Sequence, residues 1–181
     1  MKIEKYQARI DVKDYVEEYV NVEEFEEFCK ACENYGKKWS CPPFKFDPLD
    51  YWNNYDRLYL IGMKIYMDEE EQKNCRENIA KVKNEMSNFL FEMELEYVGG
   101  VSLCAGSCEI CGVEYENCTR SVNQPCRHPE HMRYSIEALG GNVGLTASKL
   151  LGLELQWIED GKMPEYFVLV GGLLYSNKCF M

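Results

Sequence analysis

The clearest pattern of hydrophobic and polar positions lies in the middle of the chain, where a buried run is followed by a helical one. Residues 57–67 (RLYLIGMKIYM) are mostly apolar or aromatic, which predicts a buried strand. Residues 69–94 place apolar side chains at helical spacing, which predicts an amphipathic helix. Those positions are Cys75, Ile79, Val82, Met86, Leu90 and Met93. Residues 97–103 predict a second strand, so the whole unit predicts a βαβ crossover.

Segments on either side of this unit predict further helices and one more strand. A capping-box-like signal at Asn21 opens a short helix, and Gly36 ends its pattern. Residues 129–139 predict another helix, because a proline is suited to the first helical turn. A helix covering roughly residues 142–151 and a core strand at residues 166–174 follow. The predicted fold class is therefore α/β or α+β, with a single sheet, a βαβ crossover and packed helices.

The length and the charge of the chain limit the number of domains and the kinds of partner that we expect. A chain of 181 residues is expected to form one domain, so we take residues 1–181 as a single metal-binding domain. The net charge of −11 argues against nucleic acid and anionic lipid as partners, and favours a partner protein with a basic patch. The N-terminal stretch has no signal-peptide core, and the longest apolar run, residues 166–175, is too short to span a bilayer. We therefore expect a cytoplasmic protein with no membrane segment.

The ten cysteines are the most informative chemical feature of the chain. Most of them fall into two tight sets with loop-like spacing. The first set is Cys29, Cys32 and Cys41, and the second is Cys104, Cys108, Cys111, Cys118 and Cys126. In a reducing compartment, cysteines at this density indicate metal binding rather than a disulfide framework.

The spacing of these cysteines favours iron–sulfur clusters. Clusters are held by soft thiolates on backbone that wraps around them, and a C-x2-C step supplies two such ligands. The stretch from Cys108 to Cys126 contains four thiols, which suffice for one [4Fe-4S] cluster. The first set supplies three ligands for a second cluster, and Cys104, at the loop entrance, is the expected fourth. Structural zinc is the main alternative, since four cysteines also make a tetrahedral zinc site.

The two cysteine blocks also resemble a known family. The motifs CKAC…NYGKKWSCPPF and CEICGVEYENC…PCRHPEHMRYSIEALGGNV are similar to those of the bacterial and archaeal predicted metal-binding protein family, a domain of unknown function common in anaerobes. The resemblance runs from Cys29 to Gly152. It implies cluster binding by the two blocks and implies no reaction. Many members have a more compact C-x2-C-x2-C step, whereas this chain has Glu114 at the third position and Cys118 four residues later.

Several residues near the cysteines have both a functional and an ordinary interpretation. Arg127, beside Cys126, is a candidate to donate hydrogen bonds to cluster sulfurs, or else forms a surface salt bridge. His128 and His131 are candidate metal ligands, but abundant thiolates would satisfy a soft metal first. We expect His128 to cap the following helix and His131 to be solvated in its first turn. Cys75, on the apolar stripe of the long helix, is expected to be a buried, inert thiol. Cys179 is expected to be free.

These features lead to three functional hypotheses. The first is an iron–sulfur protein with one or two [4Fe-4S] clusters that transfers electrons or assists a larger anaerobic enzyme. The second is a module in which zinc, or a cluster, only organises a binding surface. The third is an enzyme whose cluster keeps an open iron, which the first cysteine set permits if Cys104 is not its fourth ligand.

Overall fold

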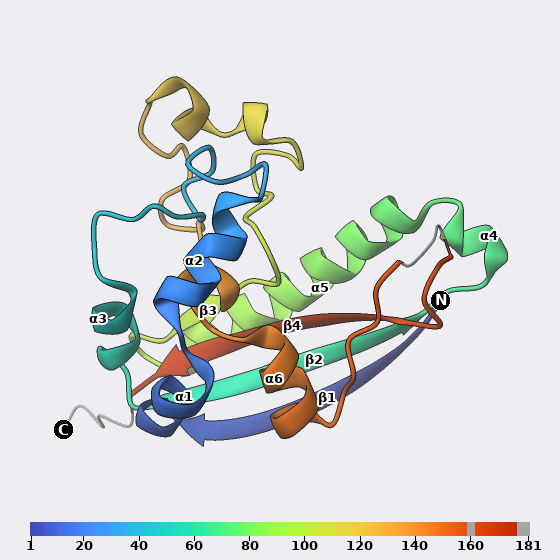
Figure 1. Cartoon of the computed structure of the whole chain (residues 1–181), viewed down its shortest axis with the longest axis horizontal. Coiled ribbons are helices and arrows are strands. Elements are labelled where there is room, and N and C mark those ends of the chain that lie inside the picture. The colour runs from blue at the N-terminus through green and yellow to red at the C-terminus, as the bar shows by residue number, and fades with distance from the viewer. Residues whose placement is uncertain (159–161, 177–181) are drawn as a thin grey trace.

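The computed structural model describes residues 1–158 and 162–176, and a four-stranded antiparallel sheet forms its base (Figure 1). The strands lie in the order β1-β2-β4-β3. Their bounds are β1 Lys2–Asp11, β2 Arg57–Tyr66, β3 Val101–Leu103 and β4 Phe167–Tyr175. The register pairs Arg57 with Tyr175 across β2 and β4, and Val101 with Leu174 across β3 and β4. Of the two fold classes that the sequence predicts, α+β is therefore the one observed.

Strand β2 lies inside the sheet and is buried on both faces, which explains its nearly unbroken apolar run. On one face, Ile61 and Met63 pack against helix α5 (Cys75–Glu96). On the other face, Leu58 and Leu60 pack against three helices. These are α1 (Val12–Tyr19), α3 (Pro48–Asn53) and α6 (Val143–Thr146). The predicted strand and its burial are thus confirmed.

The predicted crossover is formed by β2, α5 and β3, with β4 inserted between the two strands. Both β2 and β3 pair antiparallel with β4, so they run parallel to each other. The last strand of the chain therefore completes a split βαβ unit. The helix predicted at residues 69–94 is divided, because a short helix α4 (Glu69–Gln72), capped by Asp68, precedes α5. The strand predicted at residues 97–103 is confined to its last three residues.

Strand β1 is an element that the sequence analysis did not predict. Tyr6, Ala8 and Ile10 pack against the same apolar cluster as Leu58. The alternate residues, such as Lys5 and Arg9, are exposed. An edge strand with one charged face has a weak hydrophobic signal, so its alternation is easily overlooked.

The prediction of a helix at residues 129–139 is wrong. Only Glu137–Leu139 is helical, as a single 3-10 turn. The rest is held by tertiary contacts, because the Cys104 N–H donates to the Tyr134 carbonyl at 2.9 Å and Arg133 binds Glu94 of α5. These contacts take up backbone and side-chain groups that a local helix would use differently.

The two other predicted helices are present, but the first ends at Lys30, six residues before Gly36. Helix α2 (Val22–Lys30) begins at Asn21, whose side chain accepts a hydrogen bond from a backbone N–H of the first turn. Helix α6 begins at Asn142 and continues as a π-helical turn to Leu151. Gly152 ends it in the left-handed conformation, with φ of 66°.

Two irregular segments rise together beyond the end of α2, away from the sheet (Figure 1). We call residues 31–47 the first cysteine loop and residues 104–134 the second cysteine loop. They are distant in sequence, but hydrogen bonds between them place them side by side. Across residues 1–158 and 162–176, no helix combines the length and the apolar character needed to cross a membrane.

Candidate metal centre

The cysteines of the first set lie close together where α2 leads into the first cysteine loop. Cys29 lies in the last turn of α2, and the Cys32 N–H donates to its carbonyl at 2.9 Å. The loop turns through Gly36, whose φ of 70° suits glycine, and returns Cys41 to the same neighbourhood. Burial first, and the thiols of Cys41 and Cys32 second, raise the pKa of Cys29 to about 11. The structure thus brings these three residues together.

Four cysteines of the second set line one cavity that is partly open to solvent. They are Cys108, Cys111, Cys118 and Cys126. Burial is the main cause that raises the pKa of Cys108, and the thiols of Cys126 and Cys111 add to the rise. A backbone N–H of Ile110 and the charge of Lys38 oppose it. The residues that the sequence assigns to one cluster are therefore neighbours in space.

The first cysteine loop forms a wall of the same cavity through Lys38, Trp39 and Ser40. The Ser40 Oγ accepts a hydrogen bond from the Cys108 N–H at 3.0 Å. The Trp39 Nε1 donates to the Gln124 carbonyl at 3.1 Å. Because both loops contribute to it, the cavity exists only when the two segments are docked.

Arg120, which lies between Cys118 and Cys126, binds the first cysteine loop. Its guanidinium donates to the carbonyls of Lys38 at 2.9 Å and Pro43 at 2.6 Å, and also to that of Cys41. Burial raises the pKa of Cys41, and the charges of Lys38 and Arg120 are among the causes that oppose this rise. Arg120 therefore both holds the loop in place and favours a thiolate in it.

Cys104 occupies a different position, in a cavity of about 160 Å³ that opens to solvent between α5 and the second cysteine loop. Cys108 lines this cavity as well. The Cys104 thiol donates to the carbonyls of Gly106 at 3.0 Å and Arg133 at 3.3 Å. Burial raises its pKa far above the ordinary value. These contacts suit a protonated thiol, and ligation by Cys104 stays a prediction.

The basic residues predicted near Cys126 have other contacts in the structure. Arg127 donates to the Asn117 carbonyl, which fixes the backbone just before Cys118, and its bond to a cluster sulfur stays a prediction. His128 lines the four-cysteine cavity. His131 is exposed and lies edge-on to Phe91. The expectation that His128 caps a helix is wrong, because residues 129–134 are not helical, whereas His131 is solvated as expected.

The two isolated cysteines were expected to play no part in the centre. Cys75 begins α5 and packs, only half-buried, against the apolar cluster around Met86. It lies outside both cysteine sets. Cys179 lies outside the described residues.

Sequence reasoning missed Lys38, Ser40 and Arg120. A lysine that follows Lys37 in a polar loop has the local pattern of a solvated side chain, and only the docking of the second loop buries it. The available signal was position alone, since residues 38–40 directly precede Cys41. Within residues 1–158 and 162–176, no three His, Cys, Asp or Glu side chains converge closely enough to hold a single metal ion.

Comparison with known proteins bears on this arrangement of thiols. The model of the predicted metal-binding protein family DUF2284 matches residues 14–175, from α1 to the end of β4. The chain belongs to this family. The match includes strands β2, β3 and β4 and both cysteine loops, so it extends the resemblance seen from Cys29 to Gly152. No curated protein and no solved structure matches the chain.

The residues of this DUF2284 protein fit a metal group by their chemistry. The four-cysteine cavity offers soft donors, and the Ile110 N–H and the charge of Lys38 oppose the rise that burial causes in the pKa of Cys108. The description of the family and the chemistry of these residues therefore both indicate metal binding.

Proposed function

We propose that the protein is an iron–sulfur protein that holds a [4Fe-4S] cluster in the four-cysteine cavity. The observation that carries this proposal is the common cavity of Cys108, Cys111, Cys118 and Cys126. A cluster takes one thiolate per iron at its corners, which matches thiols spread around a cavity wall. Cys29, Cys32 and Cys41 would hold a second cluster beside it.

Zinc is the competing occupant, and the cavity favours the cluster. A structural zinc ion draws four sulfurs to about 2.3 Å from one point. Among the residues that the structure describes, no three His, Cys, Asp or Glu side chains converge closely enough for a single ion, and thiols spread around a cavity wall suit a larger group. Zinc would also give no redox activity, so the protein would then be a structural or binding module.

Electron transfer is the activity that such a cluster supplies. The described cysteines are all free thiols, which agrees with a reducing cytoplasm and with thiolate ligation. The net charge of −11, made more negative by a thiolate-bound cluster, favours a redox partner with a basic docking patch. We place the protein beside a larger anaerobic enzyme as its electron carrier or accessory.

An enzyme with an open cluster iron is the second candidate, and the contacts of Cys104 favour it. Carbonyl oxygens accept its thiol proton, and the same oxygens would repel a thiolate. Without Cys104, the first set has three thiolates and leaves one iron free for a small ligand.

Analysis of anaerobically purified protein tests the main proposal. We expect on the order of four iron and four sulfide per chain with one cluster, or about twice that with two. A broad absorbance shoulder near ~400 nm should accompany them, because iron–sulfur proteins are coloured and d¹⁰ zinc is not. Stoichiometric zinc without sulfide would overturn the proposal.

A further inference from the structure

Lys38 is a buried cation without a carboxylate partner. Its side chain is 2% exposed. The Nζ donates to the Val113 carbonyl at 2.6 Å, the Ser107 Oγ at 3.2 Å and the Cys108 carbonyl at 3.3 Å. All three acceptors are neutral oxygens. In residues 1–158 and 162–176, no Asp or Glu oxygen lies within ion-pair distance of this Nζ.

A charge in this position is costly unless an opposite charge lies nearby. Removing an ammonium from water costs several kcal/mol in proteins, about as much as a strong pairing can recover. Neutral acceptors satisfy its hydrogen bonds but leave its charge unbalanced. Of the neighbouring cations, Lys83 pairs with Glu109 and Arg133 with Glu94. Arg120 also binds only carbonyls, but it is less buried than Lys38.

The four-cysteine cavity is where the opposite charge would lie. Lys38 lines this cavity together with Cys108, Cys111, Cys118 and Cys126. Its Nζ donates to the Cys108 carbonyl, and its own carbonyl accepts from the Cys41 N–H at 3.1 Å, so Lys38 adjoins both cysteine sets. A cluster with four thiolate ligands is an anion, and each added electron makes it more negative.

We propose that Lys38 is the charge-compensating residue of the metal centre, and that its ammonium raises the reduction potential of the cluster held by the second cysteine set. This inference rests on the proposed function. It assigns to Lys38 a positioning and tuning role through charge, distinct from the structural tie that its hydrogen bonds also provide. Buried positive charge beside a cluster stabilises the reduced state more than the oxidised state.

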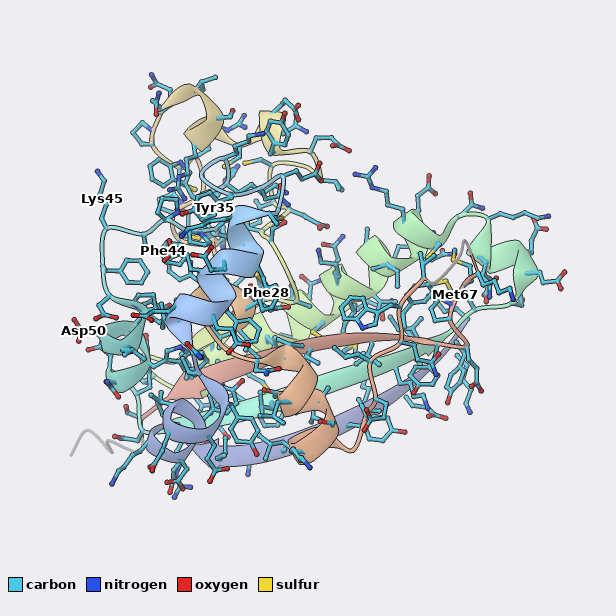
Figure 2. All side chains as sticks on the ribbon, viewed as in Figure 1. Phe28, Tyr35, Phe44, Lys45, Asp50 and Met67 are labelled. Atoms are coloured by element: carbon cyan, nitrogen blue, oxygen red, sulfur yellow. The ribbon has the colours of Figure 1, made fainter. Side chains whose placement is uncertain are left out.

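Redox titration of the lysine variants tests the role of charge. Lys38→Met removes the charge and Lys38→Gln keeps a hydrogen-bond donor without it, while Lys38→Arg keeps the charge. Lys45→Met is the matched control, because Lys45 belongs to the same loop and projects away from the cysteine loops (Figure 2). We expect the neutral variants to disfavour reduction at least tenfold, equal to a fall of about 59 mV for one electron. Lys38→Arg and Lys45→Met should stay near the wild-type potential.

The outcomes separate this inference from the proposed function. Zinc or no metal in the wild-type protein would defeat the proposed function, and the inference with it. A wild-type cluster whose potential is the same in Lys38→Met, Lys38→Gln and Lys45→Met would overturn the inference alone. If the neutral variants lose the cluster or fail to fold, Lys38→Arg decides. Full iron content at the wild-type potential then supports the role of charge, and loss of the cluster overturns it.

Discussion

Lys38 and Arg120 each donate hydrogen bonds to the backbone of the opposite cysteine loop. The Lys38 Nζ donates to the Val113 carbonyl of the second loop at 2.6 Å, and the Arg120 guanidinium donates to the carbonyl of Lys38 itself at 2.9 Å. Each loop thus supplies a cation that binds the backbone of the other. This reciprocal arrangement joins segments about 80 residues apart in the chain into one thiol-lined wall.

Replacing Arg120 with Met should loosen the docking of the first cysteine loop. The change removes charge-assisted bonds to the carbonyls of Lys38, Cys41 and Pro43. We expect the free energy of unfolding to fall by about 2 kcal/mol, as measured by urea denaturation. Arg127→Met is the control, because Arg127 binds a single carbonyl and is exposed. Equal effects of the two variants would show that Arg120 has no special role.

Cysteine variants should lose or keep iron according to whether the replaced cysteine lines the four-cysteine cavity. Cys126→Ala removes one wall ligand, so we expect loss of about four iron per chain and much of the stability, because metal binding and folding are coupled. Cys75→Ala lies on α5, away from both sets, and should keep the wild-type iron content. Iron and sulfide analysis measures both. Iron retained in Cys126→Ala but lost in Cys75→Ala would show that the ligand assignment is wrong.

Cys104 distinguishes a carrier from an enzyme. If the protein is a carrier with Cys104 as the fourth ligand of the first set, Cys104→Ala should give a three-iron EPR signal, and cyanide should leave the spectrum of the unmodified protein unchanged. Visible and EPR spectra and the iron content of both proteins measure this. A Cys104→Ala variant that keeps its iron, with a cyanide-induced shift in the unmodified protein, would instead support the enzyme, which the bonds of the Cys104 thiol to carbonyls favour.

Glu94 should make stability depend on acid pH. Burial alone would raise the pKa of this carboxylate, but hydrogen bonds from Arg133 and Ser102 hold it below the ordinary value of 4.5. The unfolded state therefore binds protons at a higher pH than the folded state. This stabilisation is fully present above the unfolded pKa and is lost as pH falls through the lower folded pKa.

The matched variant for this dependence is Glu94→Gln. At neutral pH it should be less stable than the wild type by about 2 kcal/mol, because the bonds to Arg133 are no longer charge-paired. The difference should shrink as the pH falls through the folded pKa of Glu94. Urea midpoints measured across the acid range give both values. A constant difference at every pH would contradict the proposed cause.

The sequence determined those features whose causes are local. The apolar run of β2, the caps at Asn21 and Asn142, and the stop at Gly152 each depend on neighbouring residues, and each was predictable. The grouping of Cys108 to Cys126 was also predictable, because close spacing along an irregular segment keeps thiols close in space. The motifs likewise identified the metal-binding family.

Tertiary structure determined the features that depend on contacts between segments distant in the sequence. Most of residues 129–139 do not form the expected helix, because Cys104 binds the backbone carbonyl of Tyr134 and Glu94 binds Arg133. The insertion of β4 between β2 and β3 follows from sheet pairing over more than 100 residues. The burial of Lys38 against the second cysteine loop has no sequence signature, since a lysine is ordinarily solvated. Only the docking of the two loops takes this charge out of water and places it beside the thiols.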